Sequence, residues 1–179
     1  MVIIGYQFVS YNWVSIILAL LILILVLHTL NHHSVLGARF FLLTLLFAEV
    51  WVVAQGMEMA AIELLTKIIW ANIQYIPIML IPISYFYLTF YYTRNEGWLQ
   101  KRWLPLLLLI VPVAINIVIW TNPELIRQNV YLNLSGSFPT VGKTFGPMFW
   151  VAAAYDYLLY MIEMVVLANG LREKNSLFQ

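Results

Sequence analysis

Four acidic residues lie inside long apolar segments of this sequence, and those segments hold no lysine or arginine. They are Glu49, Glu58, Asp156 and Glu163. An ionised side chain at the centre of a bilayer costs at least about 2.5–3.5 kcal/mol, so such acids are expected to be functional, protonated or hydrogen-bonded. Asp156 and Glu163 are seven residues apart and therefore share one face of a helix. We expect that face to look into the protein.

A wider set of polar residues includes two of these acids. If the chain crosses the membrane five times, the set lies in the outer half of four spans: Gln55, Glu58, Asn72, Gln74, Asn116 and Asp156. Convergent polar groups in a mostly apolar pocket are typical of a small-molecule site. The alternative is that each residue makes an interhelical hydrogen bond, worth about 0.6 kcal/mol on average in membrane proteins. We interpret the set as a candidate ligand-binding site, although any single member is more often structural.

Metal and enzyme chemistry have little support in the sequence. His28 and His32 are four residues apart and His33 follows, but the sequence places no further ligand of suitable type with them. There is no cysteine, and no glycine-rich phosphate loop, HExxH motif or nucleophile elbow occurs. We therefore expect no enzyme, no metal site and no cofactor.

Composition indicates what must position these residues. The chain has 179 residues, of which 63% are hydrophobic and 9% charged, whereas soluble domains have roughly 45–50% and about 25%. A helical crossing takes about 20 apolar residues. We predict an all-α polytopic membrane bundle, a single domain over residues 1–179, with an extracytoplasmic loop at about 121–146 whose turn signals allow a short amphipathic piece or a hairpin. The predicted spans are about 13–30, 40–61, 68–93, 103–120 and 147–171.

Two prolines stand in the third predicted span. Pro77 and Pro82 each lack a backbone donor and clash with the preceding helical turn. Neighbouring helices re-satisfy the freed carbonyls in membrane proteins. We expect a kinked helix with these prolines as candidate pivots.

Loop charges predict the orientation, because cytoplasmic loops are enriched in lysine and arginine. With the N-terminus outside and the C-terminus inside, the cytoplasmic side would hold Arg39, Arg94, Lys101, Arg102, Arg172 and Lys174, against Lys67, Arg127 and Lys143 on the other side. We predict a multi-pass protein of the inner (plasma) membrane, with the lipid bilayer as its environment. The net charge of +1, with no basic cluster, argues against nucleic-acid binding.

Features from about residue 40 to 171 resemble, in order and spacing, the N-terminal seven-transmembrane input module of bacterial histidine kinases. They begin with Trp51, Glu58 and Lys67, continue through WANIQYI, Pro77, Pro82 and FYLTFYYT, and then include Trp98, Pro112, Thr121-Asn122 and FGPMFWVAAAYDYLL. The resemblance implies a sensor whose helices receive a signal and pass it to a cytoplasmic output domain.

The sequence departs from that pattern in two ways. The histidine that often follows the Thr-Asn pair is not found in TNPELIRQN, and the last two helices and any output domain are not in the sequence. We therefore expect this polypeptide not to phosphorylate anything by itself. It is either a fragment of a longer sensor or a five-helix protein that associates with other subunits.

Three functions follow as hypotheses. The first is a membrane-embedded sensor that binds a small ligand or lipid and transmits a conformational signal, as a homo-oligomer or with other signalling subunits. The alternative is a small transporter or carrier subunit moving protons, cations or a small solute, for which internal repeats would be expected and no convincing ones are found. The third is a purely structural assembly subunit.

Overall fold

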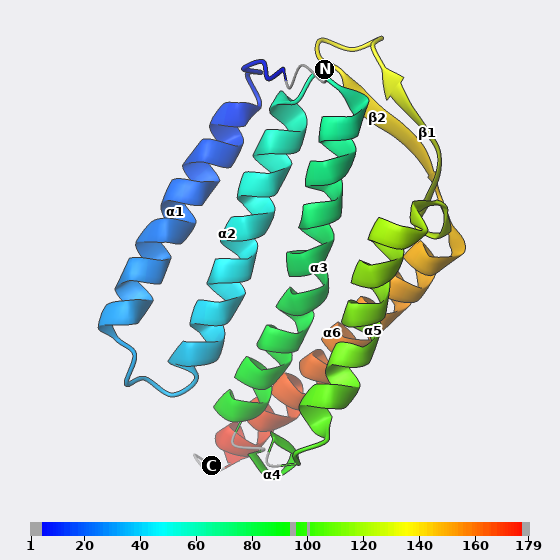
Figure 1. Cartoon of the computed structure of the whole chain (residues 1–179). Coiled ribbons are helices and arrows are strands. Elements are labelled where there is room, and N and C mark those ends of the chain that lie inside the picture. The colour runs from blue at the N-terminus through cyan, green and yellow to red at the C-terminus, as the bar shows by residue number, and fades with distance from the viewer. Residues whose placement is uncertain (1–4, 94–95, 100, 177–179) are drawn as a thin grey trace.

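The computed structural model describes residues 5–93, 96–99 and 101–176. Over these residues the chain forms five long helices, one very short helix and a two-stranded sheet (Figure 1). Five helices are long and apolar enough to cross a membrane, as the composition predicts. In chain order the elements are α1 (Asn12–Asn31), α2 (Ala38–Ala60), α3 (Leu64–Tyr92), α4 (Glu96–Leu99), α5 (Leu104–Thr121), the 3₁₀ turn η1 (Pro123–Leu125), β1 (Arg127–Asn133), β2 (Thr140–Phe145) and α6 (Pro147–Ser176).

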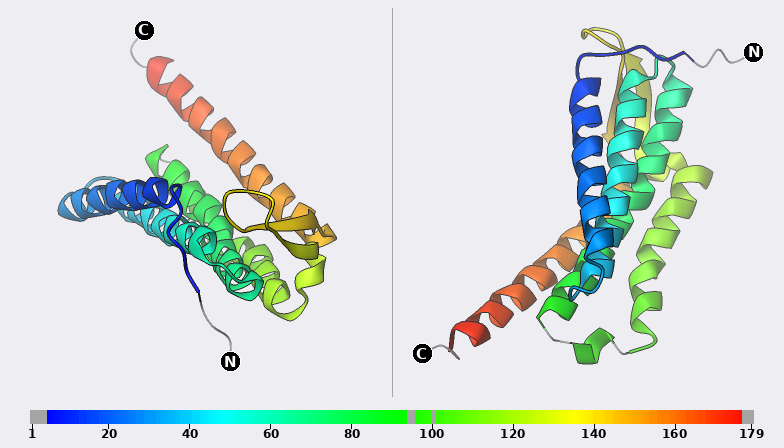
Figure 2. Two further views of the ribbon diagram at one scale, coloured as in Figure 1. Left: turned by 90° about the horizontal axis from the view of Figure 1, so that it is seen from above. Right: turned by 90° about the vertical axis from the view of Figure 1, so that its left-hand side faces the viewer.

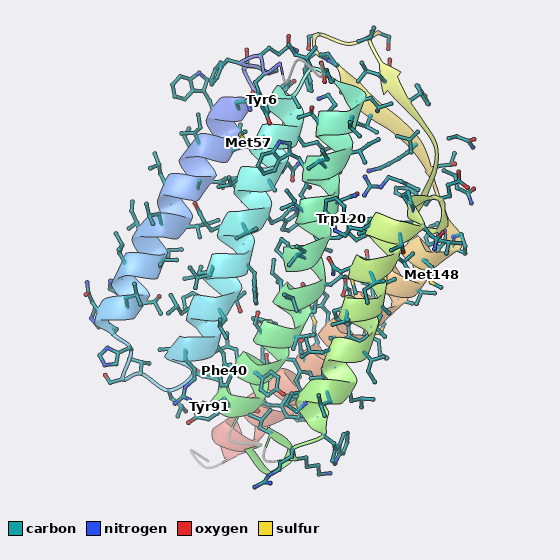
Figure 3. The ribbon with its side chains drawn as sticks, in the orientation of Figure 1. Tyr6, Phe40, Met57, Tyr91, Trp120 and Met148 are labelled. Atoms are coloured by element: carbon teal, nitrogen blue, oxygen red, sulfur yellow. The ribbon has the colours of Figure 1, made fainter. Side chains whose placement is uncertain are left out.

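Helix α3 is the centre of the molecule. It contacts α2 on one side and α5 and α6 on the other, whereas α1 packs beside α2 at the edge (Figures 1 and 2). The sequence explains the difference, because α3 carries buried polar residues such as Asn72, Gln74 and Ser84, and α1 is a run of leucine and isoleucine. Apolar side chains can face lipid directly, so α1 needs few protein neighbours (Figure 3).

The spans alternate in direction, so α1 begins at one end of the bundle and α6 finishes at the other (Figure 1). We call the first of these the hairpin end, because β1 and β2 lie there. At the hairpin end, the Trp70 indole donates to the Tyr6 hydroxyl over 3.0 Å (Figure 3). At the opposite end, the ring of Phe40 on α2 stacks on that of Tyr87 on α3, with centroids 5.3 Å apart. The aromatic stack thus joins α2 to α3 at the end away from the hairpin. The hydrogen bond joins the segment before α1 to α3 at the hairpin end.

The α1–α2 contact relies on two small residues and one amide. Asn12 Nδ2 donates to the carbonyl of Gly56 over 2.9 Å, and Asn12 Oδ1 accepts from the backbone N–H of Val9. A Cβ atom on Gly56 would lie 3.1 Å from the Cβ of Ser15. Close approach through small residues is a common way for membrane helices to associate, since lipid supplies no hydrophobic drive between them.

Helix α3 is continuous through Pro77 and Pro82, and both prolines are buried. Beyond them, Ser84 Oγ donates to the carbonyl of Ile81 and contacts Thr44 Oγ1 of α2 at 2.9 Å. A hydroxyl pair therefore joins α2 to α3 just after the second proline. The expected pivoting at the two prolines remains a prediction.

Helix α3 also begins earlier than the sequence predicts, at Leu64 instead of residue 68. The prediction left Lys67 in a polar linker, but its side chain is only 2% exposed. The ammonium group folds back onto carbonyls at the end of α2. Because the carbonyls of Glu58 and Met59 accept hydrogen bonds from the Lys67 ammonium group, Lys67 can lie within α3 and the helix can begin before it.

The stretch between α5 and α6 contains a hairpin, one of the two structures that its turn signals allow. Strands β1 and β2 are antiparallel, with Arg127 opposite Phe145 and Tyr131 opposite Gly142. A bulge lies between Gln128 and Tyr131, where Asn129 has a positive φ of 49°. Bulges of this kind bend a strand and increase its twist. The hairpin lies beside the first turns of α3 (Figure 1).

Two apolar clusters hold α3, α5 and α6 together. The cluster at the hairpin end contains Met79, Ile115, Ile119, Ile126 and Ala152. The other contains Ile83, Phe86, Phe90, Leu104, Leu108 and Leu159. Between them, the Tyr155 hydroxyl donates to the carbonyl of Leu108, 2.6 Å away. That carbonyl is freed by Pro112, so Tyr155 satisfies a group that the proline leaves without its helical partner.

The variant Gly56→Leu is expected to separate α1 from α2, because the new side chain must occupy the space of Ser15. Overpacking of this kind costs about 1–3 kcal/mol. The midpoint of thermal unfolding, followed by circular dichroism in mild detergent, should fall. Val50→Leu adds one methylene to an exposed position of the same helix and should leave the midpoint unchanged. Equal midpoints for both variants would mean that α1 does not rely on this contact.

Candidate ligand-binding site

A cavity of about 430 Å³ opens between α2, α3, α6 and strand β2, in the half of the bundle nearer the hairpin. Aromatic side chains form much of its wall, and four polar or charged side chains are distributed among them. This combination is typical of a site for a small organic molecule. The main lining residues are Trp51 and Glu58 of α2, Gln74 and Tyr75 of α3, Lys143 and Phe145 of β2, and Phe149, Asp156 and Tyr160 of α6.

Glu58 and Gln74 are joined across the α2–α3 interface. The Gln74 amide donates to Glu58 Oε2, and Gln74 is buried. Helix α2 ends two residues after Glu58, where backbone carbonyls have no partner within the helix. Lys67 Nζ donates to the carbonyl of Glu58 over 2.8 Å and approaches that of Met59 at 3.4 Å. A buried lysine therefore caps α2 and fixes the backbone that carries Glu58.

Arg127, the first residue of β1, reaches into the bundle and is only 3% exposed. Its Nη2 donates to Asn72 Oδ1 over 2.6 Å, and its guanidinium carbon lies 5.7 Å from the centre of the Tyr75 ring. Asn72 Nδ2 in turn approaches the carbonyl of Ile119 on α5 at 3.5 Å. In the described part of the chain, Arg127 Nη1 is buried without a hydrogen-bond partner.

The positive charges of the hairpin affect each other. Burial lowers the pKa of the Arg127 guanidinium, while Tyr75 and Glu58 act in the opposite direction. The pKa of Lys143 is lowered first by loss of solvation and then by the charge of Arg127, against a smaller opposing effect of Glu58. The negative charge of Glu58 thus favours the charged forms of both cations, as an acid does for nearby bases.

Asp156 of α6 lines the cavity opposite α2 and α3. Its Oδ1 is buried, and among the described residues it has no hydrogen-bond partner. Tyr157 and Tyr160 line the cavity beside it. The cavity wall therefore contains a residue with one acceptor that the described part of the protein leaves without a donor.

The structure brings together only part of the predicted polar set. Glu58, Gln74 and Asp156 line one cavity, and Asn72 lies behind its wall, bonded to Arg127. Gln55 lines a separate cavity of about 240 Å³ between α1 and α2, because its helical position turns it toward α1. Asn116 lies on α5, which does not border the larger cavity, and its Nδ2 donates to the carbonyl of Pro112. Their predicted roles in binding stay predictions.

The other two intramembrane acids lie outside this cavity. Glu163 is 1% exposed, and both of its carboxyl oxygens lack a partner among the described residues, as does Glu49 Oε2. The seven-residue spacing from Asp156 places Glu163 on the same face of α6, and both are turned into the protein. Seven residues further along, a Cβ atom on Gly170 would lie 2.8 Å from Thr93 Cγ2, just past the end of α3.

Several residues of the site were not predicted as ligand contacts. Arg127 and Lys143 entered the sequence prediction only as loop charges, and Lys67 as a loop charge and a position of the family resemblance. Tyr75, Phe145 and Phe149 entered it only as parts of apolar or matched strings. The clearest missed signal was the spacing of Lys143 and Phe145, which places both side chains on one face of a strand. Assigning that face to a site required the strand pairing and the position of the hairpin against α3.

Metal chemistry has no evident location in the described part of the chain. No group of three or more histidine, aspartate or glutamate side chains could hold an ion there. The rings of His28 and His32 lie 4.3 Å apart at the end of α1, where His32 Nδ1 contacts the carbonyl of His28. The pair is part of an exposed helix terminus.

Comparison with known families settles what kind of region these helices form. The model of one family, the N-terminal 7TM region of histidine kinase, matches residues 13–179. The chain belongs to this family. Searches of curated proteins and of solved structures gave no match. Regions of this family are the non-catalytic sensor or input part of histidine kinases. The family resemblance that the sequence indicates is therefore confirmed. The protein is accordingly a multi-pass membrane input region.

Lys67→Met is expected to destabilise this input region, because it leaves the carbonyls of Glu58 and Met59 without their donor. Buried groups that lose a partner cost about 1–3 kcal/mol each. Denaturant or thermal unfolding in mild detergent measures the loss. Arg102→Met, at an exposed position near the opposite end, should stay within about 0.5 kcal/mol of wild type. A stable Lys67→Met protein would argue against the capping role.

Proposed function

We propose that this input region senses a small molecule or a lipid by binding it in the cavity between α2, α3, α6 and β2. The observation that carries the proposal is the convergence of Glu58, Gln74 and Asp156, from three different helices, on one cavity with aromatic walls. A ligand there touches all three helices together. Its binding free energy can therefore favour one arrangement of these helices over another.

Helix α6 offers a route from the cavity to the far end of the bundle. Its inward face carries Asp156 at the cavity, then the buried Glu163, then Gly170 against Thr93. A shift or rotation of α6 at Asp156 would be transmitted along a rigid helix to the Gly170 contact. Such coupling requires that the ligand bind one helix arrangement better than the other, because equal affinity shifts nothing.

The proposal includes an orientation, with the cavity in the outer half of a bacterial inner membrane and the end of α6 in the cytoplasm. Arg39, Lys101, Arg102 and Arg172 are exposed at the end where α6 finishes. At the hairpin end, Lys67 and Arg127 are buried inside the protein, and Lys143 is exposed. Four exposed basic residues at one end against one at the other support a cytoplasmic location for the end where α6 finishes. A signal would then pass inward to an output domain or a partner subunit.

Ala153→Trp should abolish ligand binding, because Ala153 lines the cavity and the indole would fill it. Native mass spectrometry of protein released from mild detergent should show a bound small molecule or lipid on the wild type and not on this variant. The same spectra report whether the protein is a homo-oligomer. Ala154→Trp is the matched control, because the neighbouring position is exposed on the surface of α6.

Two results would contradict the cavity as a binding site. One is a wild-type spectrum with no adduct under any gentle condition. The other is an adduct that persists in Ala153→Trp to the same extent as in Ala154→Trp, which would place the bound molecule elsewhere.

Filling the cavity should also change helix packing at the far end. The sequence has no cysteine, so Leu43→Cys on α2 and Ala168→Cys on α6, both exposed positions, allow two unique spin labels. The distance distribution between the labels should shift when Ala153→Trp is added and should not shift with Ala154→Trp. Identical distributions in the three proteins would argue that α6 does not report occupancy of the cavity.

A further inference from the structure

The cavity between α2, α3, α6 and β2 has a hairpin end and an inner end. At the hairpin end, Gln74 of α3 donates to Glu58 of α2, which places these two residues at one level of the bundle. Trp51 lies seven residues back along α2 and Ile81 seven residues forward along α3, so each lies about 10 Å deeper at 1.5 Å per residue. All four residues line the cavity. The cavity therefore extends from the hairpin toward the middle of the bundle.

The charged groups of the hairpin end act on one another. Lys143 lines the cavity there, on the strand that covers it. Partial loss of solvation lowers the pKa of Lys143, Arg127 lowers it further, and Glu58 raises it. Glu58 also raises the pKa of Arg127. The carboxylate of Glu58 is thus balanced by the cations of the hairpin and bonded to Gln74, so we do not assign it to a ligand.

Asp156 lies toward the inner end of the cavity, and no base accompanies it on its helix. It comes nine residues after Pro147, the first residue of α6, which is about 14 Å along the helix axis. The stretch from Pro147 to Gly170 contains no lysine, arginine or histidine. Within the described chain, Asp156 Oδ1 is buried and accepts no hydrogen bond. A buried carboxylate is costly unless it is paired and hydrogen-bonded, so this position favours a donor that also carries positive charge.

Aromatic rings lie beside Asp156 in the cavity wall. Trp51 lines the cavity from α2, and Tyr157 and Tyr160 line it from α6. Tyr160 is four residues after Asp156 and therefore on the same side of the helix. The face of an aromatic ring attracts a cation, and tryptophan does so most strongly. Rings and carboxylate together suit a positively charged group.

We propose that the molecule bound in this cavity is a protonated organic amine, whose N–H group donates to Asp156 Oδ1 beside the ring of Trp51. Its apolar body would lie against Ile78, Ile81 and Phe149. The inference rests on the proposed function and names the class of ligand. The cavity volume of about 430 Å³ lies in the usual range for sites of small organic molecules. A quaternary ammonium ion carries the charge but has no N–H group, so it should bind less tightly.

The test uses the whole chain in micelles of an uncharged maltoside detergent. Aromatic bromine quenches tryptophan fluorescence on contact, and Trp51 lines the cavity. The probes share a bromophenylethyl body and carry an ammonium, trimethylammonium, hydroxyl or carboxylate group. Only saturable quenching that disappears in Trp51→Phe counts as binding in the cavity. Empty micelles measure partitioning into detergent.

The ammonium probe should bind about tenfold more tightly than the hydroxyl probe, which corresponds to roughly 1.4 kcal/mol, and more tightly than the other two. Asp156→Asn keeps the shape of the side chain but removes its charge, so it should abolish this preference, whereas Asp156→Glu should keep it. Lys143→Gln should not weaken ammonium binding, because it removes a positive charge from the cavity wall. Glu124→Gln is the matched control, because it removes an exposed acid outside this cavity.

Equal affinity for the ammonium and hydroxyl probes would overturn the amine assignment, and so would an ammonium preference that survives in Asp156→Asn. Tighter binding of the trimethylammonium probe than of the ammonium probe would overturn the hydrogen bond to Asp156. In each case an adduct lost only in Ala153→Trp would leave the cavity itself intact as a binding site.

If no probe gives quenching that depends on Trp51 and no adduct is seen by mass spectrometry, both proposals fail. Circular dichroism on each variant separates lost binding from lost folding. The comparison of the four probes on the wild type decides the ligand class even where a variant does not fold.

Discussion

The hydrogen bond between Arg127 and Asn72 is the interaction on which the site depends. It holds the first residue of β1 inside the bundle. The Asn72 amide in turn approaches the carbonyl of Ile119 near the end of α5. Without it, the hairpin would be a two-stranded ribbon on the surface, and such ribbons are marginal in water on their own. With it, Lys143 and Phe145 are brought to the cavity. A buried arginine is costly to accommodate, and here it holds the first residue of the hairpin against α3.

The same need to satisfy polar groups inside the membrane explains the central place of α3. Hydrocarbon offers no partner to a hydroxyl, amide or ammonium group. The polar side chains of α3 therefore face other helices, as Ser84 faces Thr44 and Gln74 faces Glu58. Lys67 belongs to the same pattern, because its ammonium group donates a hydrogen bond to a carbonyl at the end of α2. Helix α1 has few such groups, with Asn12 at its first residue bonded to Gly56 of α2, and it lies at the edge of the bundle.

Helix α6 runs from the cavity to the far end of this histidine kinase input region. Its inward face passes from the cavity to a close contact with the end of α3 at Gly170 and Thr93. Midway along that face lies Glu163, buried and without a partner among the described residues. In the proposed function, this is the face along which α6 would change its packing, since a shift between states requires two arrangements of similar free energy.

The sequence by itself determined that this is a five-span helical membrane region of the histidine kinase input family, because apolar length and the order of motifs are local properties of the chain. It also placed Asp156 and Glu163 on one inward face, since that follows from helical spacing alone. Only the tertiary structure decided that Gln55 and Asn116 lie away from the cavity and that Lys67, Arg127 and Lys143 lie at or beside it. Those positions depend on how each helix is rotated about its axis and on how the hairpin pairs and docks. Both are set by contacts between distant segments, such as Arg127 with Asn72, which no local pattern encodes.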